Sequence, residues 1–202
     1  LAEGPGGFIE ALQKYRKNDN DCYVGMTLMQ DNKDIPRWNK IQSFMKRHHS
    51  IQLEHGPKND GNLYFKHNID YIKEHHKNKY FFITADGGFD YSVDFNKQEE
   101  SSLNLIFCEI LYALLLQKQG GSFVLKVFDI FHNVTLELLF LLCYFYEQVY
   151  IFKPHTSREA NSERYIICKR FSIKANYENI IEKLLYGFND LSKQNLNGLF
   201  RF

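Results

Sequence analysis

The sequence predicts an α/β fold with a mostly parallel sheet and helices on both of its faces. Three observations support this fold class. Apolar runs that suit strands alternate with stretches of helical spacing along the whole chain. Glycine-rich loops adjoin the predicted strands, as they do in open sheets that bind ligands at their carboxyl ends. The 202 residues are enough for one medium domain with a full core.

Each predicted element follows from a local pattern. Strands are predicted where apolar and β-branched residues cluster, namely at 21–28, 51–53, 80–84, 122–129, 148–152 and 165–169. Helices are predicted where apolar residues recur every three or four positions, namely at 8–17, 35–47, 63–77, 96–117, 134–146 and 176–185. Pro36 is expected to begin the second helix, and Gly120-Gly121 to end the fourth.

Composition excludes several classes of protein. A hydrophobic content of 44% with 24% charged residues is ordinary for a globular domain, and a net charge of +1 creates no global basic field. Any contact with RNA must therefore come from a local patch. The longest apolar run, at 136–146, is about half of a membrane span and predicts a buried helix, so we expect no membrane partner.

The cysteines and histidines do not predict a metal site. The four cysteines are isolated, without CxxC spacing, and are expected to be reduced residues of an intracellular protein. The paired histidines at 48–49 and 75–76 have no carboxylate or cysteine close to them in sequence. We therefore expect no bound metal.

Asp86 is the first candidate functional residue. It directly follows the predicted strand 80–84 and Ala85, and Gly87 and Gly88 come next. A carboxylate at this end of a strand lies where open α/β sheets bind ligands, and glycines let another molecule approach the backbone closely. A simple turn cap is the alternative interpretation.

A second glycine loop and a strand lysine add to this pattern. The loop at 3–7 (EGPGG) leads into the first helix but lacks the GxGxxG spacing of a dinucleotide site, which argues against an oxidoreductase. Lys126 lies in the run FVLKVF, where an amine is costly to bury. It should therefore reach a polar site or have a partner, unless it simply extends from the strand end to solvent.

Seven segments in chain order resemble one known family. They read EGPGGF, GMTL, NDGNL, ADGGF, NKQE, GGSFVLKVFD and FKPHTSREANSERYIICK. Together they are similar to the FtsJ-like ribose 2′-O-methyltransferases, and within them to the branch that forms cap 1 on mRNA. The resemblance covers residues 1–170, and the last segment is much more specific than any glycine loop. It implies a Rossmann-like sheet with a final antiparallel strand, S-adenosylmethionine as methyl donor, and a Lys-Asp-Lys-Glu tetrad.

The resemblance assigns roles to individual residues. Asp86, Lys126 and Glu163 match the last three members of the catalytic tetrad. Matches to the cofactor-binding positions are Gly4, Pro5, Gly6, Gly7, Phe8, Asn62 and Leu63, with Asp86. Matches to positions that contact capped RNA are Asn96, Lys97, Gln98 and Asn161. Additional charge for RNA could come from Lys97, Lys153, Arg158 and Arg164, and the alternative for each of them is plain solvated surface.

The sequence departs from the family pattern at three places, one of which, the absence of an acidic residue after the second strand, is compatible with the cap-methylating branch. The first lysine of the tetrad belongs upstream of the glycine loop, so it and the preceding strand and helix are expected before Leu1. Glu159 stands where relatives often have proline. With these departures, residues 1–190 are predicted to form the methyltransferase domain and 191–202 a C-terminal tail.

The resemblance implies methyl transfer to the 2′-hydroxyl of the first transcribed nucleotide of capped mRNA. It also implies a nuclear location, or a cytoplasmic one for a viral enzyme, and other capping or transcription proteins as partners. Alternatives are the same chemistry on the second cap nucleotide, ribosomal RNA or transfer RNA. A domain that binds RNA without catalysis is the alternative from another class.

Overall fold

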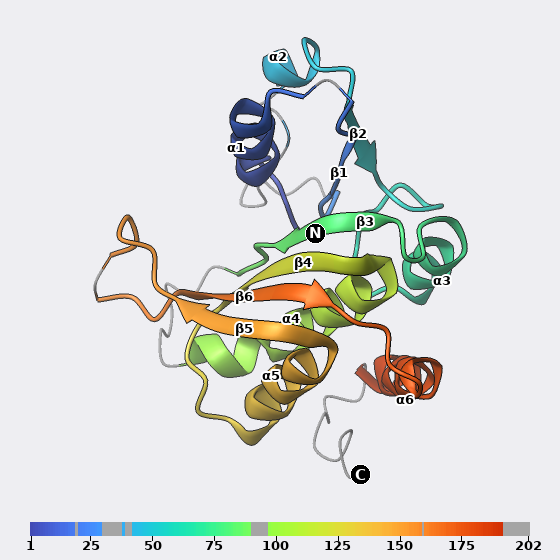
Figure 1. Cartoon of the computed structure of the whole chain (residues 1–202), viewed down its shortest axis with the longest axis vertical. Helices are drawn as coiled ribbons and strands as arrows, with labels where there is room; N and C mark the ends of the chain where they lie inside the picture. The colour runs from blue at the N-terminus through green and yellow to red at the C-terminus, as the bar shows by residue number, and fades with distance from the viewer. Residues whose placement is uncertain (19, 30–37, 39–41, 90–96, 159, 192–202) are drawn as a thin grey trace. The chain divides into compact units, whose positions relative to one another are not determined.

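The computed structural model describes residues 1–18, 20–29, 38, 42–89, 97–158 and 160–191 (Figure 1). The chain divides into two compact units, Leu1–Tyr71 and Ile72–Phe202, and the boundary falls within helix α3 (Lys66–His75). The predicted methyltransferase domain at 1–190 stays a prediction, and nearly all of the predicted tail lies outside the described residues.

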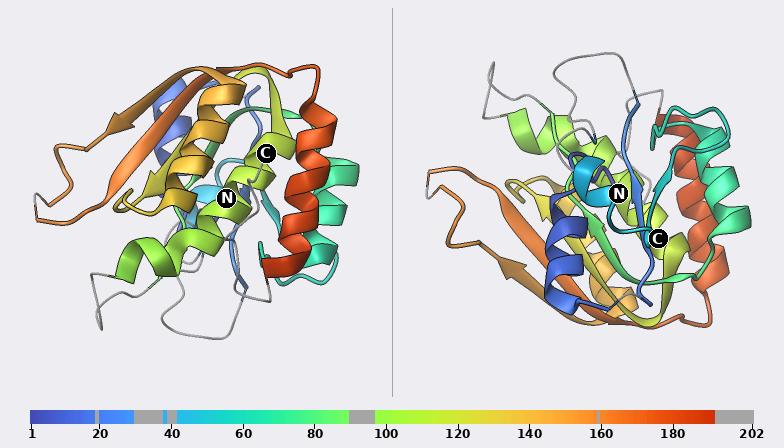
Figure 2. Two further views of the ribbon diagram at one scale, coloured as in Figure 1. Left: turned by 90° about the horizontal axis from the view of Figure 1, so that it is seen from below. Right: turned by 90° about the horizontal axis from the view of Figure 1, so that it is seen from above.

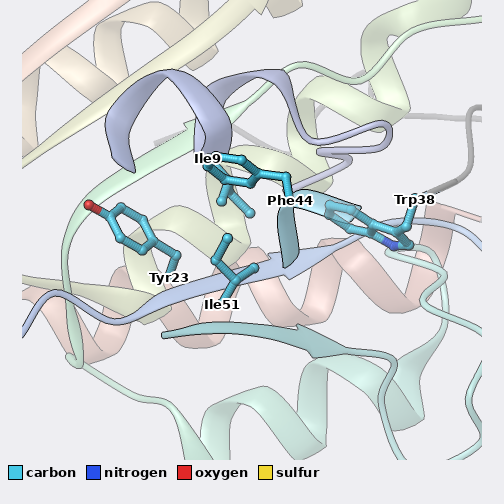
Figure 3. Packing of buried hydrophobic residues seen from close by; sticks show 5 residues of the cluster. All are labelled: Ile9, Tyr23, Trp38, Phe44 and Ile51. Carbon is cyan, nitrogen blue, oxygen red and sulfur yellow. The ribbon is translucent and has the colours of Figure 1, made fainter. Parts of the chain in front are cut away.

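The first unit is built on two parallel strands. β1 (Tyr23–Met26) pairs with β2 (Ile51–Glu54) over their full lengths. Helices α1 (Gly7–Arg16) and α2 (Gln42–Met45) supply apolar side chains to this pair. Figure 3 shows the resulting core, which consists of Ile9, Tyr23, Trp38, Phe44 and Ile51.

The second unit contains a four-stranded sheet in the order β3-β4-β6-β5 (Figure 1). The strands are β3 (Tyr80–Ala85), β4 (Gln117–Val127), β5 (Tyr146–Phe152) and β6 (Arg164–Phe171). β3 and β4 are parallel, whereas β6 is antiparallel to both of its neighbours. The predicted α/β class and the final antiparallel strand are confirmed.

Helices pack on the sheet of the second unit or on one another. α4 (Gln98–Leu116) packs against β4, α5 (Asn133–Phe145) against β5, and α6 (Tyr177–Asp190) lies alongside α4 (Figure 2). In β4, Phe123, Leu125 and Val127 are fully buried. Because side chains alternate along a strand, Lys126 points to the opposite face of the sheet.

Two predictions about these elements are wrong. Gly120-Gly121 do not end the fourth helix, because α4 ends at Leu116 and the glycine pair lies inside β4, where its pairing with β3 shifts register. The apolar helix at 136–146 is not fully buried. Leu138, Leu142 and Phe145 lie in the core, but Leu136 and Phe140 on its other side are 48% and 72% exposed.

The remaining predicted elements are found with small shifts at their ends. Most of the predicted helix at 35–47 lies outside the described residues, and α2 is the part that is described. All four cysteines are free, with Cys108 and Cys168 buried and Cys22 and Cys143 exposed. None of the helices in the described ranges is both long and apolar enough to cross a membrane.

Candidate active site

Asp86 and Lys126 meet at the carboxyl ends of two parallel strands. Asp86 follows β3 directly, and Lys126 is the penultimate residue of β4. The Nζ of Lys126 lies 3.2 Å from Oδ1 of Asp86 and donates a hydrogen bond of 2.8 Å to its backbone carbonyl oxygen. The lysine side chain is only 14% exposed, and a buried amine needs a polar partner. Asp86 is that partner, as the sequence predicts.

Gly88 adjoins this ion pair. A Cβ atom added to Gly88 would lie 3.3 Å from the Nζ of Lys126 and 3.7 Å from its Cε. A side chain at this position would therefore crowd the amine. The second glycine after Asp86 leaves room for the end of the lysine side chain, which is a more specific reason for its presence than the turn alone.

Glu163 lies on the same face of the sheet as Lys126. It immediately precedes β6, in which Tyr165 is the cross-strand partner of Lys126. Residues two apart in an extended segment share a face, so Glu163 follows Tyr165 on the Lys126 side. Its Oε1 accepts a hydrogen bond of 3.4 Å from the Ser157 hydroxyl. The structure thus joins Asp86 to Lys126 directly and places Glu163 one step further along the same face.

Tyr165 is a member of this cluster that sequence reasoning missed. Its hydroxyl donates a hydrogen bond of 3.1 Å to Oδ1 of Asp86, the same oxygen that lies beside Lys126. Burial raises the pKa of Tyr165, and the charges of Asp86 and Glu163 raise it further, so the hydroxyl stays a donor. The signal was present in the SERY segment, because a residue two positions after Glu163 shares its face.

Glu109 is a second missed residue. It lies in the middle of α4, is 1% exposed, and its Oε1 accepts a hydrogen bond of 3.0 Å from the backbone N–H of Gly87. Burial raises the pKa of Glu109 to about 7, although the Gly87 N–H and the positive charge of Lys126 oppose this rise. An acidic residue within the apolar run IFCEILYALLL was the available sequence signal.

The loop between β5 and β6 is held by side chains that were predicted to contact RNA. The Nζ of Lys153 donates hydrogen bonds to the backbone oxygens of Asn161, at 2.7 Å, and Glu163, at 2.9 Å, and another to the Asn161 side chain. Arg164 donates to the Ser162 carbonyl, at 3.0 Å, and pairs with Asp129. Within this structure, Lys153 and Arg164 therefore stabilise the loop that leads into Glu163.

The start of α4 adjoins the same loop. The Ser162 hydroxyl donates a hydrogen bond of 2.9 Å to Oε1 of Gln98, which is buried. Lys97 precedes it and is exposed. Two of the segments predicted to bind RNA, at 97–98 and 161, are thus brought next to Glu163. Asn96 and Glu159 lie outside the described residues.

The predicted cofactor residues of the first unit gather after β1. The Glu3 N–H donates to the carbonyl of Met26, and the Met29 N–H donates to that of Asp60, so the loops at 3–7 and 60–63 lie along the same short segment. Gly61 has a φ of +58°, and an added Cβ would lie 1.9 Å from the Thr27 carbonyl oxygen. Only glycine fits there, which keeps the second loop close to the end of β1.

Hydrogen bonds fix the shape of these two loops. Oε1 of the buried Glu3 accepts from the Ile9 N–H at 3.0 Å, which ties the glycine loop to α1. Asp60 accepts from the Asn62 N–H at 2.9 Å and from the Asn68 amide at 2.6 Å. Gly7 is exposed, and an added Cβ would meet no atom within 4 Å, whereas Leu63 is buried in the core.

Among the described residues, neither the two loops nor the ion pair contains a set of side chains that could bind a metal ion. In the described part of the chain, no group of three or more histidine, cysteine, aspartate or glutamate side chains is arranged to hold a metal ion. The chemistry at the edge of the sheet is that of an amine held between a carboxylate and a carbonyl oxygen, with a second carboxylate on the same face. Such a group can orient a hydroxyl and stabilise charge that develops on it.

A model of the FtsJ-like methyltransferase family matches residues 1–171. The chain belongs to this family. The match includes the two loops that are predicted to bind the cofactor, the Asp86–Lys126 pair and the segment that carries Glu163. FtsJ-like methyltransferases use S-adenosylmethionine, so the predicted methyl donor is consistent with the family.

Relatives of this FtsJ-like chain include proteins named cap-specific mRNA (nucleoside-2′-O-)-methyltransferase 1. The protein from Drosophila melanogaster is 38% identical over 174 residues, which are 84% of this chain and 21% of that protein. The one from Caenorhabditis elegans is 33% identical over 194 residues, or 94% and 20% of the two chains. The Homo sapiens protein is 35% identical over 178 residues, or 86% and 21%. The chain spans about a fifth of the length of these relatives.

A solved structure shares the fold of this FtsJ-like chain. It is a putative ribosomal RNA methyltransferase from Plasmodium falciparum, with a TM-score of 0.53 and 17% identity, covering 83% of this chain and 81% of the other. At this level of identity the similarity supports the fold alone. The predicted Rossmann-like methyltransferase fold is confirmed.

Proposed function

We propose that this FtsJ-like domain transfers a methyl group from S-adenosylmethionine to the ribose 2′-hydroxyl of the first transcribed nucleotide of capped mRNA. The observation that carries the proposal is the ion pair between Lys126 and Asp86 at the carboxyl edge of the sheet, 3.2 Å across, in a chain whose relatives bear the cap-specific name. The alternatives from sequence are methylation of another RNA, or RNA binding without catalysis.

The two loops at the end of β1 fit the methyl donor. Gly4, Pro5, Gly6, Gly7 and Phe8, together with Asn62 and Leu63, are the residues of the first unit that would hold it, and Asp86 is the match to a cofactor position in the second unit. The exposed Gly7, with open space where a Cβ would stand, leaves the start of α1 accessible to a ligand. When bound, S-adenosylmethionine supplies a methyl carbon on a positively charged sulfonium.

The contacts of Lys126 define how it would act. A lysine ammonium has three N–H donors, and here Asp86 faces the amine with both its carbonyl oxygen and Oδ1. Among the described residues this amine has no further hydrogen-bond partner, so a third donor is available to the ribose oxygen, which it would orient and stabilise as negative charge develops. Acceptance of the proton by neutral Lys126 is the other role, and it requires a second positive charge nearby because Asp86 and Glu163 favour the ammonium form.

RNA would reach this edge along the segments around Glu163. Asn96, Lys97, Gln98 and Asn161 are proposed to contact the capped RNA, and Gln98 and Asn161 already adjoin Glu163 through Ser162 and Lys153. RNA ends are recognised by contacts to phosphates, hydroxyls and stacked bases rather than by a groove code. A nuclear location and contacts with capping or transcription proteins follow from the same proposal, with a cytoplasmic location for a viral enzyme.

Methyl transfer to matched RNA oligonucleotides tests the proposal. The full-length protein is incubated with radiolabelled S-adenosylmethionine and four transcripts: capped, uncapped, capped with a 2′-O-methyl group on the first nucleotide, and capped with one on the second. We expect incorporation into the first and last transcripts only. Incorporation into the uncapped RNA, or into the RNA whose first nucleotide is blocked, would indicate another RNA target. Binding of capped RNA without transfer would indicate a non-catalytic domain.

A further inference from the structure

Glu109 occupies a position that a carboxyl group rarely takes. Fifteen of the 19 residues of α4 are buried, and Glu109 is 1% exposed among them. Burial of an ionisable group in apolar surroundings is costly unless other groups compensate. Its Oε1 accepts the Gly87 N–H at 3.0 Å, whereas its Oε2 is buried without a hydrogen-bond partner among the described residues. An apolar side chain would serve the core better, so the carboxyl group calls for a functional explanation.

The peptide that Glu109 contacts is the one that also holds Lys126. The N–H of Gly87 and the carbonyl of Asp86 belong to the same peptide unit, which is planar and trans, so the two groups point in opposite directions. Glu109 accepts from the N–H side at 3.0 Å, and Lys126 donates to the carbonyl side at 2.8 Å. The unit is therefore held from both sides, by a helix residue and by a strand residue.

We propose that Glu109 is a positioning residue of the methyl-transfer site, which holds the Asp86–Gly87 peptide so that Asp86 keeps the amine of Lys126 in place. The inference rests on the proposed function. Rotation of this peptide about its flanking bonds would move the carbonyl away from the Nζ and would change the direction of the Asp86 side chain. Glu109 prevents that rotation because it is itself fixed in the packed centre of α4.

The contact needs an acceptor oxygen and not a charge. Burial raises the pKa of Glu109 to about 7, the Gly87 N–H and Lys126 lower it, and the charge of Asp86 raises it, so both protonation states are accessible at neutral pH. A carboxylate and a protonated carboxyl group both present an oxygen to the Gly87 N–H. Glutamine has the same length and also presents an oxygen, whereas leucine and methionine present none.

Kinetics of Glu109→Gln, Glu109→Leu and Glu109→Met in the full-length protein test the inference. We expect Glu109→Leu and Glu109→Met to lower kcat about tenfold, as expected for the loss of one hydrogen bond that fixes the reacting geometry, with KM for capped RNA and for S-adenosylmethionine within about twofold. Glu109→Gln should stay within about threefold of the wild-type kcat. Two apolar variants are used because one of them can fail to fold.

Glu99 provides the matched control. It is a second buried carboxylate of α4, 4% exposed, and its partners are the backbone of Phe131 and His132 and the side chain of Thr135 at the start of α5. Glu99→Gln should lower stability while kcat, measured well below the unfolding temperature, stays within about twofold. Equal losses of kcat in Glu99→Gln and Glu109→Leu would overturn the inference, because both would then act through the fold alone.

Two further outcomes would overturn it. One is a wild-type kcat in Glu109→Leu or Glu109→Met, and the other is a loss in Glu109→Gln as large as in the apolar variants. Amide hydrogen exchange at Gly87 supplies a readout that does not depend on activity: we expect faster exchange in the apolar variants than in Glu109→Gln. If the wild-type protein transfers no methyl group, the proposed function fails. The exchange measurement still tests Glu109 in that case: equal exchange at Gly87 in the wild type and in the apolar variants would reject Glu109 as the group that holds this peptide.

Discussion

Two buried glutamates of α4 show how one helix serves both the fold and the site. Glu99, in the first turn, accepts three hydrogen bonds from the start of α5. Glu109, near the middle, accepts one from Gly87 beside the ion pair. Both oxygens of Glu99 accept hydrogen bonds, whereas Oε2 of Glu109 has no hydrogen-bond partner in the part of the chain that the structure describes. The difference agrees with the two proposed roles, in which Glu99 supports the fold and Glu109 supports the site at a cost in burial.

The pKa values of the two glutamates move in opposite directions. Burial raises the pKa of Glu99, but hydrogen bonds from Thr135, His132 and Phe131 outweigh it, and the result lies below the ordinary value. Burial raises the pKa of Glu109 to about 7, and the hydrogen bond from the Gly87 N–H does not compensate. Glu99 thus stabilises the fold when ionised, and Glu109 destabilises it when ionised. The following predictions test this contrast, from the largest expected effect to the smallest.

Removal of the amine at the site should abolish methyl transfer without unfolding the protein. We expect Lys126→Ala to lower kcat at least ~1,000-fold, because the group that orients the ribose oxygen is lost, while S-adenosylmethionine still binds. Single-turnover assays and cofactor-binding titrations measure the two effects. Lys126→Arg keeps the cation but cannot accept a proton at neutral pH, so methyl transfer by this variant would support the orienting role over proton acceptance. Full turnover by Lys126→Ala would remove Lys126 from the reaction.

Stability should depend on pH through Glu109. Between its ordinary pKa of 4.5 and about 7, the folded chain keeps this proton while the unfolded chain loses it, so the free energy of unfolding falls as pH rises. The loss amounts to about 3 kcal/mol across this range. Denaturant unfolding of the wild type and of Glu109→Gln at pH 5 and pH 7.5 measures it. The wild type should lose more stability than the variant, and identical pH dependence would show that Glu109 is not buried as described.

Loss of the Glu99 carboxylate should affect the fold rather than the site. Glu99→Gln leaves one acceptor oxygen for three donors and turns an amide group toward N–H groups at the start of α5. We expect a loss of about 2 kcal/mol in the free energy of unfolding at pH 7. Because the folded pKa of Glu99 is lowered, this contribution is present above the unfolded pKa and is lost as pH falls through the folded pKa, so the gap between wild type and variant should narrow from pH 7 to pH 3. An equal gap at both pH values would contradict this account.

The smallest effect is expected at Tyr165. Tyr165→Phe removes the hydroxyl that donates to Oδ1 of Asp86 at 3.1 Å but leaves the contacts of Lys126 in place. Loss of one hydrogen bond to a partly exposed carboxylate should lower kcat by about threefold to tenfold, with little change in KM for the cofactor. Steady-state kinetics on capped RNA measure it. A fall as large as that of Lys126→Ala would instead place Tyr165 among the reacting groups.

Much of the fold was predictable because its signals are local. Apolar runs predicted β3, β4, β5 and β6 to within a few residues, apart from the early start of β4 at Gln117. The error at Gly120-Gly121 arose because a glycine pair after a long helix usually ends it, whereas here the pair lies within β4, at a point where strand register shifts. That shift depends on the pairing with β3, which no local pattern reveals.

The site was predictable only as separate segments. The motifs indicated Asp86, Lys126 and Glu163, but the cross-strand register that sets Tyr165 opposite Lys126 is a property of the assembled sheet. Glu109 was overlooked because it is separated from Gly87 by 22 residues and its helix looks like an ordinary apolar core element. Lys153 was expected to supply charge for RNA, and its three contacts with Asn161 and Glu163 appear only when the loop is folded.

A double-mutant cycle on Asp86 and Lys126 tests the central claim most directly. Single-turnover methyl transfer to capped RNA is measured for the wild type, Asp86→Asn, Lys126→Met and the double variant. If the two side chains act as one unit, the double variant should be no slower than the slower single variant, because the first substitution already removes the shared function. Rate losses that multiply would show that the two residues act independently and would contradict the account.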